Sequence, residues 1–273
     1  MTTENNLNNL VGDRFFHSLT EHLCTTVNAD VVYIGEIVNE GKHMRTISVS
    51  CSGYPGENFN YELEGTPCRH LPENGIYSYP SNVQEAFPDD FMLLDMAIEG
   101  YIGVPLTNQA GDFLGTLVAL YHHPVSDPSF VGSQLIRFSL RTAAELERKQ
   151  VDEKFQESES HFRALVELMQ DALVITDISG IVTGVSEPAS CLVGLPPLNF
   201  IGKPFMELLA NDSVQLFLQE FEKLITTAIP RAELELRIHT KNGAVKLVKY
   251  HAVVTCKNNV VTGTMGLLHD LSR

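Results

Sequence analysis

The chain has 273 residues, of which 44% are hydrophobic and 19% are charged, a composition typical of a soluble folded protein. Acidic residues outnumber basic residues 34 to 19, which gives a formal net charge of -15. Because binding to nucleic-acid phosphates needs clustered lysine and arginine, this balance argues against a nucleic-acid partner.

The N-terminal stretch MTTENNLNNLVGD has neither the basic nor the apolar region of a secretory signal. No apolar run long enough to span a membrane occurs elsewhere, so we expect a cytoplasmic protein without a membrane partner. Five widely spaced cysteines form no C-x-x-C pair, which indicates reduced thiols and predicts no metal site. They are Cys24, Cys51, Cys68, Cys191 and Cys256.

The first part of the chain alternates between helical and strand patterns. Apolar residues from Phe15 to Val27 recur every three or four positions, which predicts an amphipathic helix. The β-branched runs VVYIGEIV (31–38) and RTISVSC (45–51) predict paired antiparallel strands. A long excursion, Ser52 to Glu99, precedes the runs YIGVPL and FLGTLVALY, which predict a second hairpin. This order places the excursion over one face of the sheet, where a pocket can form.

A long polar helix is predicted from about Phe130 to Met169, because this stretch lacks proline and its apolar residues are sparse. A heptad assignment gives a weak apolar seam. It has Phe155, Phe162 and Met169 at position a, preceded there by Arg141 and Arg148, and Ala144, Val151, Ser158 and Leu165 at position d. The helix either packs on its own domains or forms a parallel coiled coil with a second chain. We favour the coiled coil, since so long and polar a helix has little else to bury against.

The last part of the chain predicts a second antiparallel sheet with helices on one face. DALVITDISGIVTGVS indicates a strand, a tight turn and a strand. IGKPFMELL and SVQLFLQEFEKLI are helical patterns, the second capped by Asp212 or Ser213. A hairpin around Asn242-Gly243 and the run VVTGTMGLLHDLS complete the sheet. The fold class is therefore α+β, with two domains joined by a long helix.

Three phrases in the first domain carry a resemblance to a known family. They are ENFNYELEGTPC, FPDDFMLLDMAIEGYIGVPL and GDFLGTLVALYHHP, and they span the predicted sheet and excursion. Together they resemble the recurrent phrases of GAF domains over about Phe15 to Glu145.

The second domain resembles a PAS domain over about His161 to Arg273. The match rests on FRALVELMQDALVITDISGIV, LVGLPPLNFIGKPFMELL, HTKNGAVKLV and the terminal HDLSR. The last phrase is similar to the ending that connects a PAS core to its output domain, in which Asp270 would form an ion pair. One departure is Glu187 in VSEPAS, where the family usually has asparagine.

The resemblance implies a sensory module of the kind fused to a histidine kinase in two-component systems, or to an output that makes or degrades cyclic di-GMP. No kinase, cyclase or helix-turn-helix pattern is found, so we expect no enzyme within these residues and an effector domain or protein downstream. The expected organisation is a tail at 1–14, a GAF-like domain at 15–129, a helical linker at 130–160 and a PAS-like domain at 161–273.

The resemblance also guides the search for cofactors, none of which is firmly indicated. A flavin photoadduct would need an Asn-Cys-Arg phrase, and PPLNFIG has no cysteine at that place. Haem would need a histidine between Ile201 and Ile229, where there is none. A bilin would need a thiol beside the pocket, commonly followed by histidine, to which Cys68-Arg69-His70 is only an approximation.

The candidate site residues fall into two groups. The GAF pocket would be lined by Tyr33, Tyr61, Thr66, Cys68, Tyr77 and Tyr101, and would take an unknown small molecule. Signal transmission would involve Phe155, Ser158, Phe162, Leu165 and Asp270. We expect a homodimeric module that transmits a ligand- or redox-dependent change. The alternatives are a thiol-dependent redox enzyme using Cys68 and a ligand-free dimerisation scaffold.

Overall fold

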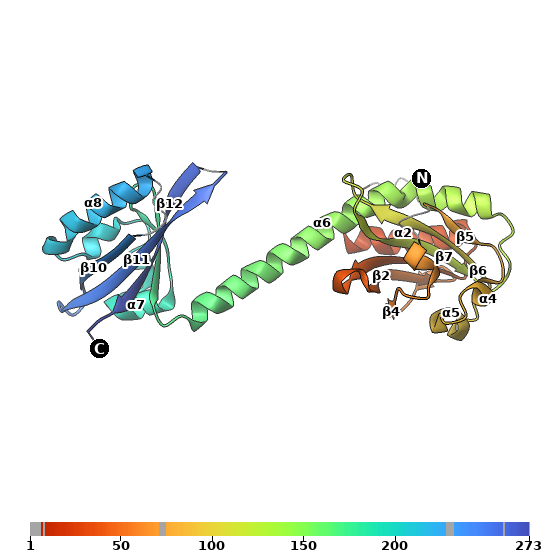
Figure 1. Cartoon of the computed structure of the whole chain (residues 1–273), viewed down its shortest axis with the longest axis horizontal. Coiled ribbons are helices and arrows are strands. Elements are labelled where there is room, and N and C mark those ends of the chain that lie inside the picture. Colours follow the sequence, from red (N-terminus) through yellow and green to blue (C-terminus); the bar gives the residue numbers. More distant parts are fainter. Residues whose placement is uncertain (1–6, 8, 71–74, 228–231, 259, 273) are drawn as a thin grey trace. The chain divides into compact units, whose positions relative to one another are not determined.

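The structure is a computed structural model that describes residues 7, 9–70, 75–227, 232–258 and 260–272. The chain divides into two compact units, Met1–Phe155 and Gln156–Arg273, and the division falls within helix α6 (Pro128–Leu168), as Figure 1 shows. Each unit contains an antiparallel sheet flanked by helices. The predicted α+β arrangement with two domains and a long joining helix is therefore confirmed.

The sheet of the first unit has the strand order β3-β2-β1-β7-β6-β5, and β4 also pairs with β2. The two predicted hairpins are present, because β1 pairs with β2 and β6 pairs with β7, both antiparallel. The strands are β1 (Val31–Val38), β2 (His43–Cys51), β3 (Tyr54–Pro55), β4 (Asn60–Glu62), β5 (Tyr77–Tyr79), β6 (Gly100–Thr107) and β7 (Phe113–Tyr121).

One face of this sheet is covered by helix α2 (Asp13–Thr26) and by the first half of α6. The helices contribute the buried residues Phe15, Leu19, Leu135 and Leu146 to a core with the inward side chains of β1, β6 and β7. Leu7, within the predicted tail, is buried in the same core. One side of the first half of α6 is therefore buried against its own unit, unlike the expectation that this helix has little to pack on.

The excursion between β2 and β6 covers the opposite face. It contains the 3-10 helix η2 (Pro67–His70) and the short helices α4 (Val83–Ala86) and α5 (Phe91–Asp95). Across this face the register sets Tyr33 of β1 opposite Val118 of β7, Val118 opposite Gly103 of β6, and Gly103 opposite Tyr77 of β5. Side chains of the excursion pack onto this row and form a second core cluster.

The sheet of the second unit has the order β10-β11-β12-β8-β9, with all pairs antiparallel. Helix α8 (Asn211–Thr227) lies against one face of it (Figure 1), and α7 (Glu187–Val193) follows β9. The strands are β8 (Ala172–Asp177), β9 (Val182–Val185), β10 (Ala232–His239), β11 (Val245–Lys257) and β12 (Val260–Asp270).

Two helical predictions in this unit need correction. Helix α8 begins at Asn211, so Asp212 and Ser213 lie in its first turn instead of capping it. Their side chains bind β10, where the hydroxyl of Ser213 accepts from the amide of Arg237 and Asp212 pairs with its guanidinium. The pattern IGKPFMELL forms a turn and a 3-10 helix, η4 (Phe205–Leu208), because Gly202 has a φ of 80°.

Aromatic rings fill the interior between this sheet and its helices. The ring of Tyr250 stacks on Phe205 with centroids 5.6 Å apart and meets Phe217 edge-on at 6.0 Å. Tyr250 also lies over Gly266, where a Cβ atom would come within 2.2 Å of the tyrosine ring. The glycine is what allows the large ring to lie flat on the sheet.

Candidate functional site

The first unit contains a buried thiol surrounded by three phenol groups. The Sγ atom of Cys68 lies 3.1 Å from the hydroxyls of both Tyr61 and Tyr101, and 3.4 Å from that of Tyr33. The hydroxyls of Tyr33 and Tyr61 are themselves 2.9 Å apart. We call Tyr33, Tyr61, Cys68 and Tyr101 the tyrosine–thiol cluster.

Four separate elements bring this cluster together. Tyr33 and Tyr101 project from β1 and β6 onto the face that the excursion covers, whereas Tyr61 lies on β4 and Cys68 on η2. Tyr101 lies over Gly103, where a Cβ atom would come within 2.5 Å of its hydroxyl. Because Gly103 has no side chain, there is space for the phenol of Tyr101, which points toward the thiol of Cys68.

The other two predicted pocket residues have different environments. Thr66 is buried, but its hydroxyl donates to the carbonyl of Leu63 and so shapes the turn before Cys68. Tyr77 is half-buried and packs against the second core cluster, with its ring 5.4 Å from that of Tyr79. The side chain of His70, the neighbour considered for Cys68, lies outside the part of the chain that the structure describes.

Burial controls the protonation of the tyrosine–thiol cluster. It raises the pKa of the Cys68 thiol, and the hydrogen bonds from Tyr101, Tyr33 and Tyr61 offset this only in part. It also raises the pKa of each of the three phenols well above the ordinary value. Thiol and phenols are therefore neutral near pH 7, and Cys68 is only 1% exposed.

An acidic residue, Asp90, lies beside this cluster. Its carboxylate caps α5, where Oδ1 accepts from the amides of Met92 at 3.1 Å and Leu93 at 3.2 Å. Burial raises the pKa of Asp90, and these two amides lower it only in part. The sequence showed Asp90 within the phrase FPDD but gave no sign that it would be buried, since acidic residues are mostly exposed.

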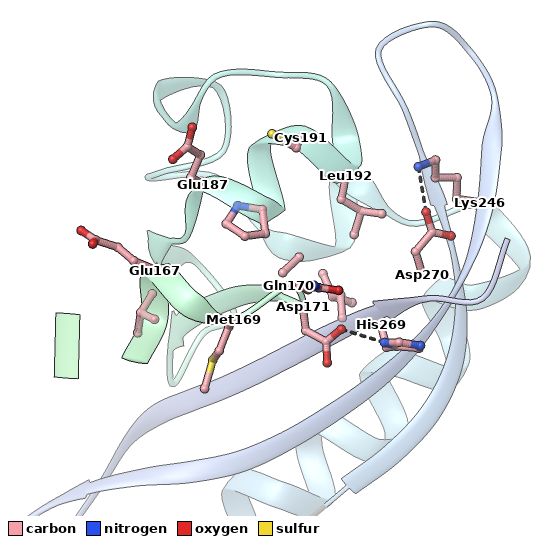
Figure 2. A pocket seen from close by; sticks show the side chains of 14 residues that line it. Glu167, Met169, Gln170, Asp171, Glu187, Cys191, Leu192, Lys246, His269 and Asp270 are labelled. Atoms are coloured by element: carbon pink, nitrogen blue, oxygen red, sulfur yellow. Dashed lines mark hydrogen bonds and ion pairs between the residues drawn. The ribbon is translucent and has the colours of Figure 1, made fainter. Parts of the chain in front are cut away.

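A pocket of about 590 Å³ lies in the second unit, at the end of α6 (Figure 2). Asp171, between α6 and β8, lies 2.7 Å from the Nδ1 atom of His269 on β12. Next to it, the Nζ atom of Lys246 on β11 donates to Asp270 at 2.9 Å. Figure 2 shows Glu187 and Cys191 on the other side of the pocket, both from α7.

Asp270, predicted to transmit the signal, therefore has a basic partner at the end of β12. Burial raises its pKa, but the hydrogen bonds from Lys246 and Ser272 outweigh this effect and hold the pKa below the ordinary value. The sequence analysis did not single out Asp171, Lys246 or His269. Asp171 precedes β8, Lys246 lies on β11 and His269 lies on β12, and the pairing of β12 with both β8 and β11 brings these segments together.

The four other predicted transmission residues all lie on the second half of α6. Phe155 is 69% exposed, Leu165 is 60% exposed and Phe162 is 49% exposed, and Ser158 is exposed beside them. Phe162 also borders a largely apolar groove of about 240 Å³ on the outer face of the second sheet.

Two general features complete the description of the site. Among the residues that the structure describes, no group of three or more His, Cys, Asp or Glu side chains is placed to hold a metal ion. Over the same residues, none of the helices has the length and apolar character needed to cross a membrane.

Comparisons with known proteins identify the second unit. Residues 160–271 match the family model described as PAS fold, so this part of the chain is a PAS domain. None of the curated proteins matches the chain.

Several solved structures are similar to the chain. The PAS domain of an HTR-like protein from Haloarcula marismortui is 15% identical with a TM-score of 0.40, covering 45% of this chain and 99% of that one. A PAS domain from Colwellia psychrerythraea is 20% identical with a TM-score of 0.36, covering 41% and 96%. The DhaR(N)–DhaL complex of E. coli is 17% identical with a TM-score of 0.38, covering 62% of this chain and 55% of that one.

Proposed function

We propose that the chain is the input part of a sensory protein, with a GAF-like ligand-binding domain at 15–129 and the PAS domain after it. The PAS domain supports a role in signal sensing in general. The phrases that resemble GAF domains coincide with the antiparallel sheet, with its excursion and with the tyrosine–thiol cluster. An effector domain or protein would receive the signal after β12.

The observation that carries this proposal is the exposed second half of α6. From Val151 to Leu165 every residue of the helix is exposed, although Val151, Phe155, Phe162 and Leu165 are large and apolar. They recur at the a and d positions of a heptad, which is the spacing that a parallel coiled coil buries. A second copy of this chain, aligned in parallel, would cover all four at once.

The transmission step would act through α6, because this helix belongs to both units. Its first half packs on the first sheet through Leu135 and Leu146, and its end borders the pocket that holds Asp171 and Asp270. A ligand in the first unit would favour one of two packings of α6 on the sheet. The paired helices would then carry this difference to the PAS domain.

The redox-enzyme alternative is not favoured by any observation. A catalytic thiol needs a lowered pKa and access to substrate, whereas burial raises the pKa of Cys68 and leaves it 1% exposed. The scaffold alternative differs from the sensor only in having no ligand, so binding measurements separate the two.

The dimer can be tested with two matched substitutions in the full chain. Ser158 at position d and Ser160 at position f are both exposed, so Ser158→Leu adds an apolar group to the seam and Ser160→Leu adds one outside it. We expect Ser158→Leu to lower the dimer dissociation constant by about tenfold or more, since two leucine side chains become buried. Ser160→Leu should leave it unchanged.

Sedimentation equilibrium measures both constants. A chain that stays monomeric in the wild type and both variants would refute the coiled coil. An equal decrease of the dissociation constant in both variants would also refute the coiled coil, because it would show that the chains do not associate through the a and d positions.

A further inference from the structure

The apolar groove of about 240 Å³ in the second unit lies between the end of α6 and the outer face of the sheet. Phe162, Val166 and Met169 line it from the helix side, and their spacing of four and three positions puts them on one side of the helix. The sheet side consists of Leu173 before and within β8, of His251, Ala252 and Val253 on β11, and of Met265 and Leu267 on β12. The groove therefore has a helical wall and a sheet wall.

Apolar side chains remain exposed around this groove because the end of α6 does not pack closely on the sheet. The buried residues that the structure describes on α6 all lie between Val131 and Leu146, in its first half. At the groove, Phe162 is 49% exposed, Val253 is 41% exposed and Met169 is 39% exposed. Covering such a group of apolar side chains is favourable, and their gathering in one groove indicates a binding site.

The size of the groove decides what kind of occupant it can take. A cavity of about 150 Å³ lined by apolar side chains is enough to bind benzene. The groove, at about 240 Å³, therefore has room for an aromatic ring with a second fused ring or a short substituent. A helix of a partner protein is about 10–12 Å across with its side chains and is too wide for this space. The volume thus favours a small molecule.

The chemistry of the lining selects an uncharged aromatic molecule. Among the described lining residues there is no Asp, Glu, Lys or Arg, so a charged ligand would lose its hydration without gaining a partner. The polar side chain in the lining is His251, and its Nδ1 atom already lies 3.6 Å from the carboxylate of Glu233. The thioethers of Met169 and Met265 and the ring of Phe162 make favourable contacts with an aromatic ring.

We propose that this groove binds a small uncharged aromatic molecule, which packs between Phe162 and Met169 on the helix side and Val253 and Met265 on the sheet side. The inference goes beyond the proposed function, because it gives the PAS domain a ligand site of its own and does not depend on the coiled coil. A ligand held there would contact both walls and so fix the end of α6 on the sheet.

The ligand test uses two indole probes, because the chain contains no tryptophan and the fluorescence of an added indole ring reports its own surroundings. Methylindole and indolecarboxylate, substituted at the same ring carbon, share the ring and differ in charge. Titration with the full chain should show a saturable blue shift of methylindole, with a dissociation constant below about 1 mM. The affinity for indolecarboxylate should be lower by about tenfold or more. Absence of saturable methylindole binding, or equal affinity for both probes, would overturn the proposal.

The residue test uses two neighbouring positions at the end of α6. Met169→Glu puts a charge into the groove, whereas Leu168→Glu puts the same charge on a side chain that is 80% exposed and does not line it. We expect Met169→Glu to weaken methylindole binding by about tenfold or more and Leu168→Glu to leave it unchanged. Full affinity in a folded Met169→Glu protein, or equal weakening in the two variants, would exclude this groove as the site. If Met169→Glu does not fold, the comparison of the two probes in the wild type decides.

The alternative occupant is a side chain from a second copy of the chain. Methylindole binding should persist at protein concentrations at which the chain is dimeric, and its loss there would overturn the proposal, because it would show that the second copy fills the groove. A chain that forms the seam-dependent dimer but never binds methylindole would leave the sensory module standing and remove only this site. A chain that binds methylindole but shows no seam-dependent dimer would do the reverse.

Discussion

The thiol of Cys68 illustrates how position within the fold decides the chemistry of a residue. In the sequence, Cys68 stands beside an arginine and a histidine and suggests a nucleophile. In the fold it is enclosed by the phenols of Tyr33, Tyr61 and Tyr101, and burial raises its pKa. The resulting neutral thiol acts as a hydrogen-bonding centre that fixes three aromatic side chains.

This environment predicts the reactivity of the thiols. Cys51, Cys191 and Cys256 are exposed, whereas Cys24 and Cys68 are buried. Titration with a chromogenic disulfide should therefore detect three thiols in the native protein and five after denaturation, because buried neutral thiols react slowly. The variant Cys68→Ser should keep three reactive thiols in the native state. Rapid reaction of Cys68 in the native wild type would contradict this prediction and would favour the thiol-dependent redox enzyme instead.

The ion pair between Asp270 and Lys246 predicts a dependence of stability on pH. Because the folded-state pKa of Asp270 is lowered, the pair stabilises the protein above the unfolded pKa of about 3.9. This contribution is lost as the pH falls through the lower folded-state value. Asp270→Asn should therefore destabilise the PAS domain at pH 7 and have a smaller effect near pH 3, where part of this contribution has been lost.

Urea unfolding at the two pH values measures the difference. Asp212→Asn serves as the control, since its pair with Arg237 is more than half exposed and contributes little. An equal effect of Asp270→Asn at both pH values would show that the ion pair is not the cause.

At the scale of elements, a buried acidic residue attaches α6 to the first sheet. Glu36 of β1 is 2% exposed, and its Oε1 accepts from Nε of Arg45 at 2.8 Å. The Nζ atom of Lys149 on α6 lies 3.7 Å from the same oxygen. The proposed signal thus has a polar connection from strand to helix in addition to the apolar packing.

Removing the charge of Glu36 should loosen this connection. Glu36→Gln leaves the two bases without their buried partner, so we expect the first unit to lose about 1.5–3 kcal/mol of unfolding free energy. Glu153→Gln is the matched control, because Glu153 also pairs with Lys149 but is half exposed, and it should cost less than about 1 kcal/mol. Similar losses of unfolding free energy in the two variants would mean that the burial of Glu36 does not strengthen its ion pairs.

The sequence predicts elements far better than it predicts contacts between them. Alternating and helical patterns located the longer strands and α6 because those patterns reflect burial along a single segment, but they did not show the short strands β3, β4 and β5 within the excursion. The start of α8 was misplaced because Asp212 and Ser213 bind β10, a contact that local pattern does not show. For the same reason Asp90 and the pair formed by Asp171 and His269 were missed, whereas two of the tyrosines at Cys68, Tyr61 and Tyr101, lie in the phrases that resemble GAF domains.

At the scale of the whole molecule, the two units have separate hydrophobic cores. Phe15 belongs to the core of the first unit and Phe205 to the core of the PAS domain, and both side chains are fully buried. No residue belongs to the core clusters of both units among those the structure describes. Stability should therefore be a property of each unit and not of the chain as one cooperative body.

Phe15→Ala and Phe205→Ala test this independence. Each substitution removes a buried ring and should cost its own unit about 3–5 kcal/mol, which lowers that unit's melting temperature by about 10 °C or more. The other unit should melt at the wild-type temperature. Hydrogen exchange followed by mass spectrometry reads the two units separately within the full chain. If either substitution lowered protection equally in both, the units would unfold together and α6 would couple their stabilities as well as their conformations.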